Sequence, residues 1–136
     1  MEELIKLRSI ISSDHRFLYD LLKERDPRAN ISHKKMPTFS EHKKFVSSNP
    51  YAKWYIIEKN GEKAGSIYLT KTDEIGIFIE KSFHRQGIGK IALNLLIEKN
   101  PRDRYLANVN PQNKKSLEFF KNNSFNLIQH TFELEK

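Results

Sequence analysis

Residues 74–98, EIGIFIEKSFHRQGIGKIALNLLIE, contain two regular elements with a glycine-containing loop between them. Residues 75–79 place isoleucine at every second position, and this period of two predicts a strand with one packed face. Residues 88–96 repeat apolar side chains at the i, i+3, i+4, i+7, i+8 spacing of a buried helical face. The helix is expected to begin near Gly87 and to end at Asn100-Pro101. The stretch therefore predicts an interior strand, a loop and a helix, in that order.

The loop at residues 84–90, HRQGIGK, has the features of a phosphate-binding turn. Its two glycines let the backbone approach a ligand closely, and the unbonded N–H groups of the first helical turn point towards that ligand. The loop has neither the longer glycine spacing of a dinucleotide fingerprint nor the Gly-Lys-Ser/Thr ending of a nucleotide P-loop. We therefore expect a phosphate-bearing ligand of another kind.

Composition limits the class of protein. The 136 residues, 38% of them apolar, predict a single domain over 1–136, and the apolar runs are too short to predict a membrane partner. Cysteine is absent, which excludes a disulfide framework, and the first ten residues mix charge with apolar side chains, so a cytoplasmic location is expected. The five histidines lack a paired ligand spacing, so no metal site is expected.

A net charge of +7, from 24 Lys+Arg against 17 Asp+Glu, favours anionic partners. The lysines occur as short pairs rather than as one basic block, and most aromatic residues lie at core periods. A phosphorylated ligand is therefore preferred over nucleic acid, although a small basic nucleic-acid binder is kept as a rival class.

The rest of the chain alternates strand and helix patterns, which predicts an α/β protein. Asn60-Gly61 marks a hairpin turn, and a second turn at Thr72-Asp73 makes the three strands around them an antiparallel meander. The helical crossover should place the strand at 105–109 parallel to that at 75–79. The further expected elements are strands at 3–10, 54–58, 66–70 and 125–134, the last as one strand or a bent pair, and helices at 14–25, 38–48 and 113–122.

Two motifs and the order of elements resemble the GCN5-related N-acetyltransferase (GNAT) superfamily. The acetyl-CoA loop of that family, Gln/Arg-x-x-Gly-x-Gly/Ala, falls on residues 84–89, with His84 in place of the usual Gln or Arg. The last helix of the family often carries Asn-x-x-Ala/Ser-x-x-x-Tyr followed by Gly-Phe. Here Asn113, Ser116, Phe120 and Phe125 stand at those positions.

The resemblance implies an α/β (α+β) GNAT fold. Its sheet would be mixed and mostly antiparallel, with six or seven strands, about four helices, and parallel, splayed fourth and fifth strands. It also implies an N-acetyltransferase that uses acetyl-CoA and binds the CoA pyrophosphate through the backbone of the loop, with Arg85 and Lys90 adding charge nearby. The cofactor-binding residues implied in this way are Phe78, Ile79, His84, Arg85, Gln86, Gly87, Ile88, Gly89, Lys90, Asn113 and Phe120.

The proton-transfer groups are less well defined by the sequence. Phe120 stands where the family usually has a tyrosine general acid, and it has no proton to give. The thiolate is then protonated by water or by another group, for which Tyr68 and Tyr105 are candidates, or the step needs no dedicated acid. Two residues are candidates for the base. Glu74 opens the strand near the place where several members carry a glutamate, and His42 has an imidazole with an ordinary pKa of about 6.5.

The acceptor region is predicted from a weaker resemblance. The string NISHKKMPTFSEHKKF is similar to the acceptor region of members that acetylate amino-sugar nucleotides. That would place Arg28, His33 and Glu41 against the substrate, together with His42. A protein N-terminus, a small polyamine and a non-catalytic CoA-binding module stay open as alternatives, and the chain is expected to be a monomer or a homodimer.

Overall fold

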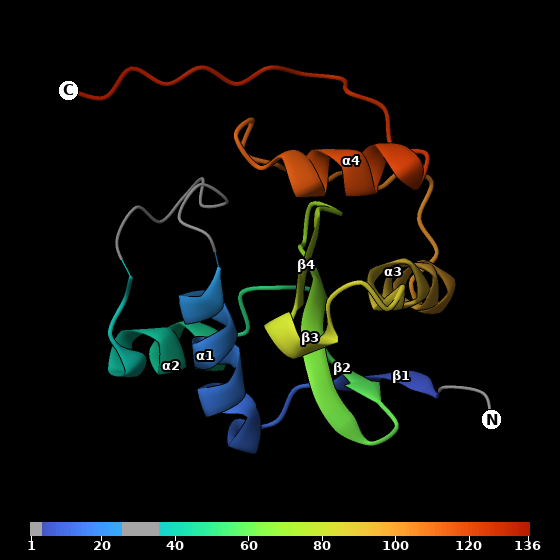
Figure 1. Cartoon of the computed structure of the whole chain (residues 1–136). Helices are drawn as coiled ribbons and strands as arrows, with labels where there is room; N and C mark the ends of the chain where they lie inside the picture. The colour runs from blue at the N-terminus through green and yellow to red at the C-terminus, as the bar shows by residue number, and fades with distance from the viewer. Residues whose placement is uncertain (1–3, 26–35) are drawn as a thin grey trace.

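A computed structural model of the chain describes residues 4–25 and 36–136 (Figure 1). Two of the expected acceptor residues, Arg28 and His33, lie outside this part. Its strands are β1 (Ile5–Ser9), β2 (Lys53–Lys59), β3 (Glu62–Leu69) and β4 (Ile75–Ile79). Its α-helices are α1 (His15–Glu24), α2 (Phe39–Ser47), α3 (Ile88–Lys99) and α4 (Lys114–Asn122), and short 3-10 helices lie at Ser12–Asp14 and Lys81–Phe83.

The sheet has the order β1-β2-β3-β4, and all neighbours are antiparallel. Asn60 and Gly61 form the β2–β3 turn with φ angles of 50° and 85°, the left-handed values that such a hairpin turn requires. Asp73, in the turn before β4, also has a positive φ of 62°. The expected meander of the second, third and fourth strands is confirmed.

The two faces of the sheet pack against different helices. On one face, strand residues and one side of α3 form the main core, in which each fully buried Ile or Leu contributes about 1.5–3 kcal/mol. Its buried members are Tyr55, Ile57, Ala64, Ile67, Leu69, Ile75, Ile88, Ala92, Leu93 and Leu96. On the other face, Ile56 of β2 packs against Leu18 of α1 and Val46 of α2. Figure 1 shows α1 and α2 on one side of the sheet and α3 on the other.

A buried ionic cluster ties the start of the chain to the sheet. The carboxylate of Asp14 is fully buried and accepts two hydrogen bonds from the guanidinium of Arg8, at 2.9 and 3.1 Å. The ammonium of Lys63 lies 2.8 Å from the same carboxylate, and the backbone N–H of Ile11 donates to it at 2.8 Å. Burial alone would raise the pKa of Asp14, but the bonds from Arg8 and Lys63 outweigh it and hold the pKa well below its usual range.

The prediction of six or seven strands is wrong for the described residues, in which the sheet has four. The strand expected at 105–109 is reduced to one parallel bridge between Glu74 and Leu106. The N–H of Ile75 donates to the carbonyl of Leu106 at 2.8 Å, and the N–H of Leu106 donates to Asp73 at 2.9 Å. Beyond these bonds the two segments separate, so no ladder forms.

The strand expected at 125–134 is also absent. Phe125 is held at the end of α4 by a backbone bond to Phe120 of 2.9 Å, and the chain then runs past α4 towards the C-terminus as an extended segment (Figure 1). A strand needs a neighbouring edge for its backbone groups, and 105–109 does not supply one here. The tail leaves four large apolar side chains exposed, namely Leu127, Ile128, Phe132 and Leu134.

None of the helices in the described residues has the length and apolar character needed to cross a membrane.

Candidate functional site

One edge of β4 is not used by the sheet. Two backbone bonds at its ends show which edge faces β3. The N–H of Thr70 donates to the carbonyl of Glu74 at 2.8 Å, and the N–H of Glu80 donates to the carbonyl of Ala64 at 2.7 Å. Because backbone bonds alternate along an antiparallel pair, the even-numbered residues of β4 face β3 and the odd-numbered ones face the opposite edge. Ile75 uses that edge to bond Leu106. The backbone groups of residues 77 and 79 therefore point to the place where the neighbouring segment has moved away.

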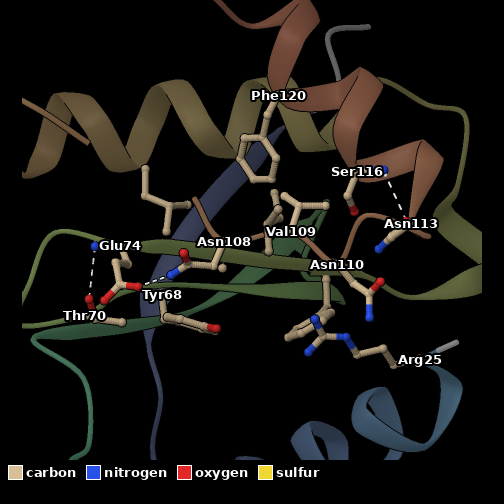
Figure 2. Close-up of a pocket in the computed structure, with 14 residues that line it drawn as sticks. Arg25, Tyr68, Thr70, Glu74, Asn108, Val109, Asn110, Asn113, Ser116 and Phe120 are labelled. Carbon is tan, nitrogen blue, oxygen red and sulfur yellow. Dashed lines mark hydrogen bonds between the residues drawn. The ribbon is translucent and has the colours of Figure 1, made fainter. Parts of the chain in front are cut away.

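A pocket occupies this gap (Figure 2). It encloses about 90 Å³, which is the space of roughly three water molecules. Its walls come from the end of α1, from β3 and β4, from the 108–110 segment and from α4. The lining residues are Arg25, Tyr68, Thr70, Glu74, Ile75, Gly76, Ile77, Phe78, Asn108, Val109, Asn110, Asn113, Ser116 and Phe120.

Glu74 is held at one end of this pocket by neighbouring donors (Figure 2). Its carboxylate accepts short hydrogen bonds from the side-chain amide of Asn108 and from the hydroxyl of Thr72. Its backbone N–H donates to the hydroxyl of Thr70 at 3.0 Å. These bonds fix the direction of the carboxylate, which a group that takes up a proton from a bound substrate needs.

Tyr68 covers the backbone of β4 because Gly76, opposite it in the register, has no side chain. A Cβ added at Gly76 would lie 2.0 Å from Cζ of Tyr68. The ring of Tyr51 stacks on that of Tyr68, with centroids 3.9 Å apart and planes at 5°, and Trp54 meets both rings edge-on. Burial, followed by the proximity of Tyr68, raises the pKa of the Tyr51 hydroxyl. The stack forms an aromatic wall on the α1–α2 side of the sheet.

The other tyrosine considered as an acid, Tyr105, is not brought to the pocket. Its hydroxyl donates to the carbonyl of Asn100 at 2.6 Å and accepts from the N–H of Arg102 at 2.9 Å. These bonds attach it to the C-terminal end of α3.

Arg25, which the sequence analysis did not select, lies at the opposite end of the pocket from Glu74 (Figure 2). It directly follows α1, and its guanidinium carbon lies 4.3 Å from the centroid of the Phe78 ring. Burial lowers the pKa of this guanidinium. The sequence offered little sign of this position, because the last residue of an amphipathic helix before Asp26-Pro27 is usually a solvated cation.

The motif on α4 contributes three residues to the pocket. Asn113 is the N-cap of α4 and accepts from the backbone N–H of Ser116 at 3.3 Å, so it has the structural role of a helix cap while also facing the pocket. Phe120 is buried and packs edge-on against Phe119 and Phe125, with centroids 5.2 and 5.1 Å away. Its ring points from α4 towards Asn108 and Val109 (Figure 2).

The glycine loop is exposed and turns sharply before α3. Arg85 and Gly87 both have positive φ angles, 62° and 74°, and Gly87 is the N-cap of the helix. The first-turn N–H groups of residues 88–90 therefore lie at a helix start with no side-chain cap bond from Gly87. An imidazole nitrogen of His84 lies 2.8 Å from the carbonyl of Ile79, which joins the loop to the end of β4.

Three further loop residues have different surroundings. Gln86 is exposed, and its side chain accepts a short bond from Lys59 and donates to the carbonyl of Ser82. Lys90 is exposed. At Gly89 an added Cβ would lie 3.0 Å from the ring of Phe119, so this glycine lets α4 pack against the start of α3.

The two α2 residues expected at the site lie away from the β4 pocket. His42 is buried, with ring centroids 5.6 Å from Tyr19 and 6.4 Å from Phe45. Glu41 accepts from the N–H of Thr38 at 2.9 Å in a capping box, and this bond lowers the pKa of the exposed carboxylate. Both residues line a wider cleft that continues from the pocket. Among the described residues, no group of three His, Cys, Asp or Glu could hold a metal ion.

The sequence and the fold were compared with those of known proteins. The sequence matches the acetyltransferase (GNAT) family over residues 15–125. The chain therefore belongs to the acetyltransferase (GNAT) family. A search of curated proteins found no match.

Solved structures share the fold at low sequence identity. A domain from Methanocaldococcus jannaschii has a TM-score of 0.82 at 21% identity, covering 97% of this chain and 94% of that one. RimL, a ribosomal L7/L12 alpha-N-protein acetyltransferase in complex with coenzyme A, has a TM-score of 0.74 at 22% identity, covering 92% and 81%. The protein yncA from Salmonella typhimurium, solved with its cofactor acetyl-CoA, has a TM-score of 0.69 at 14% identity, covering 90% and 79%.

Proposed function

We propose that this protein is an acetyl-CoA-dependent N-acetyltransferase in which a primary amine attacks the thioester directly. The observation that carries the proposal is the edge of β4 beyond Ile75, along which no neighbouring strand of the described residues pairs; it lies between the glycine loop at the start of α3 and the N-terminal end of α4. Family membership over residues 15–125 supports the reaction class. Two relatives of the same fold are described as complexes with coenzyme A or acetyl-CoA.

The chain has suitable groups for the pyrophosphate and for the pantetheine arm of the donor. The open N–H groups of residues 88–90, with Arg85 and Lys90 beside them, suit a pyrophosphate. The edge-facing N–H groups of residues 77 and 79 and the C=O of residue 77 suit the amides of a pantetheine arm, which would extend β4 as a further strand would; the C=O of Ile79 already lies 2.8 Å from an imidazole nitrogen of His84. Asn113 and Phe120 would contact the arm from α4. The main chain of Phe78 is a weaker candidate than that of Ile77, because its backbone groups face β3.

The proposed reaction needs one base and no covalent intermediate. The neutral amine attacks the thioester carbon, a C–N bond forms, the C–S bond breaks, and the thiolate leaves. Glu74, directed by Asn108 and Thr72, takes the amine proton directly or through one water. Phe120 has no proton for the thiolate, so we assign that step to water. His42 is the second candidate base, but its packing between Tyr19 and Phe45 favours a structural role.

The acceptor is a primary amine, and an amino-sugar nucleotide is our first proposal for it, from the sequence. Glu41 and the wider cleft that it lines would contact this acceptor. A protein N-terminus or a small amine is the alternative. A cytoplasmic location and a monomeric or homodimeric state are proposed with it, and a non-catalytic CoA-binding module is the rival function.

Two measurements separate these functions. We expect acetyl-CoA to raise the melting temperature of the protein, because a ligand that binds only the folded state stabilises it by mass action. Release of CoA thiol in the presence of a panel of amines then distinguishes an enzyme from a binding module. Absence of the melting shift would contradict the proposed donor.

A further inference from the structure

The segment at 105–109 has a second edge, opposite to the one that faces β4. Leu106 directs both of its backbone groups to β4, through the two bonds of the parallel bridge. Because successive residues of an extended chain direct their backbone groups to opposite edges, those of Tyr105 and Ala107 face away from β4. Within the described part of the chain, neither residue makes a backbone hydrogen bond on that side. The segment therefore offers this edge to a further strand.

Residues 126–136, called the C-terminal tail below, have the pattern of a strand. Ile128, Phe132 and Leu134 lie at even positions, so a strand would place them on one face. They are 68%, 92% and 84% exposed, and Leu127, which would lie on the opposite face, is 70% exposed. In the described residues no backbone bond joins the tail to another segment. Exposed apolar side chains on an extended segment of this kind are typical of a strand that adds to another chain.

The tail and the 105–109 segment both line the wider cleft, which has a volume of about 2150 Å³, and α4 contributes part of its wall. The tail begins after Phe125, whose N–H donates to the carbonyl of Phe120 at 2.9 Å, and it extends away from the sheet past α4 (Figure 1). One chain therefore carries both an unpaired strand and an edge that could receive one, and the two are not joined. A second copy supplies what each of them lacks.

We propose that the tail of one copy adds as a strand to the 105–109 segment of a second copy, which makes the protein a homodimer with exchanged tails. In a two-fold symmetric dimer each copy gives one tail and receives one. The incoming tail occupies the edge opposite to β4, so the edge that faces β4 stays available to the donor. The α1–α2 part of the wider cleft, which contains Glu41, stays available to the acceptor.

The surface that this exchange buries has the size that a specific dimer needs. Burying one large apolar side chain removes roughly 60–120 Å² from water, and the surface that receives it loses a similar area. Each tail carries four such side chains, so two tails carry eight. The total is roughly 1,000–1,900 Å². This range overlaps the total area of about 1,200–2,000 Å² that specific protein interfaces bury.

Light scattering tests whether the tail holds a dimer together. The wild type should have twice the chain mass of 16.1 kDa and should dissociate on dilution. Phe132→Glu places a charge in the proposed interface, so we expect it to raise the Kd of the dimer at least about tenfold. Leu4→Glu is the matched control, because Leu4 is also an exposed apolar residue but precedes β1, and it should leave the Kd unchanged. Melting temperatures check that each variant is folded, and Ile128→Glu replaces Phe132→Glu if that variant is not.

Introduced cysteines show which copy the tail contacts. The protein has no cysteine of its own, so a disulfide forms only where two cysteines are placed. Ala107→Cys is combined in one chain with one tail cysteine at a time, and four tail positions cover both faces and neighbouring registers. The tail variants are Ile128→Cys, Gln129→Cys, His130→Cys and Thr131→Cys. After oxidation we expect covalent dimers on a denaturing gel, with mass spectrometry showing peptides linked between position 107 and the tail.

The outcomes distinguish the exchange from its alternatives. A monomer at every concentration overturns it, and so does a dimer that Phe132→Glu leaves as tight as the wild type. Disulfides between position 107 and the tail of the same chain also overturn it, because they show that the tail folds back within one copy. The acetyltransferase proposal is tested separately, by the acetyl-CoA melting shift and by thiol release, so each proposal can fail while the other stands.

Discussion

The side-chain amide of Asn108 donates to the carboxylate of Glu74 across 34 positions of sequence. The bond links the start of β4 to the segment that separates from it, at the end of the single parallel bridge. It therefore lies where these two segments begin to diverge and the pocket opens. Asn108 both orients the candidate base and holds one wall of the site in place.

Replacing the candidate base should slow turnover without affecting the donor. Glu74→Gln keeps the shape and the bond to Thr72 but cannot accept a proton, so we expect kcat to fall by roughly 10²- to 10⁴-fold. The acetyl-CoA melting shift should stay as in the wild type. Glu62→Gln, at an exposed position of β3, is the control. If Glu74→Gln is active and His42→Ala is folded but inactive, His42 is the base.

The glycine loop can be tested with two glycines of equal backbone strain. Gly87 and Gly61 have φ angles of 74° and 85°, and an added Cβ would meet nothing within 4 Å at either position. Alanine should therefore destabilise the fold by about 1 kcal/mol at each, as measured by denaturant unfolding. We expect Gly87→Ala alone to weaken acetyl-CoA binding, because the turn orients the first N–H groups of α3. Equal acetyl-CoA affinity in both variants would reject the loop assignment.

Phe120→Tyr would restore a hydroxyl at the position where the family carries an acid. The ring is directed into the pocket, so the added oxygen should reach polar surroundings near Asn108 and cost little stability. We expect acetyl-CoA affinity to change by less than about threefold and kcat to stay equal or rise. Phe119→Tyr is the control, because it adds the same hydroxyl at the neighbouring position, which does not line the pocket. A large loss of stability in Phe120→Tyr would mean that the ring lies in a sealed apolar site.

The buried carboxylate of Asp14 predicts a loss of stability in acid. Its folded pKa is lowered, so its contribution is fully present above the unfolded value of about 3.9 and is lost as the pH falls through the folded value. Asp14→Asn leaves Arg8 and Lys63 without their buried partner, and we expect it to cost on the order of 3 kcal/mol at neutral pH. Urea unfolding of both proteins between pH 3 and 7 measures this. The difference between them should shrink below about pH 4; a constant difference would contradict the assignment.

Local patterns predicted the elements that depend on local chemistry. The isoleucine period at 75–79, the helical period after Gly87 and the Asn60-Gly61 turn all appear where expected, since each depends on residues close in sequence. The segments 105–109 and 125–134 have residues suited to strands, yet pairing depends on a partner edge that composition does not specify. The first forms one bridge and the second none.

The site was predictable to a similar extent. The loop and the α4 residues were predicted from short motifs, and Glu74 from its place at the start of the strand; the structure brings Glu74, Asn113 and Phe120 to one pocket. Arg25 was missed because its position depends on how α1 packs against β4. Asn108 was missed because its bond to Glu74 depends on where the parallel bridge ends. His42 has suitable chemistry, but packing of α2 against α1 turns it towards aromatic rings.

Gly76 and Tyr68 cannot vary independently of each other. The ring of Tyr68 occupies the volume in which any side chain at position 76 would begin, so Gly76→Ala alone must displace the ring from Tyr51 and open the aromatic wall. Once Tyr68 has been replaced by a small residue, the same alanine meets no ring and becomes nearly neutral. The effect of a substitution at position 76 therefore depends on the residue at position 68. This is epistasis created by one cross-strand pair.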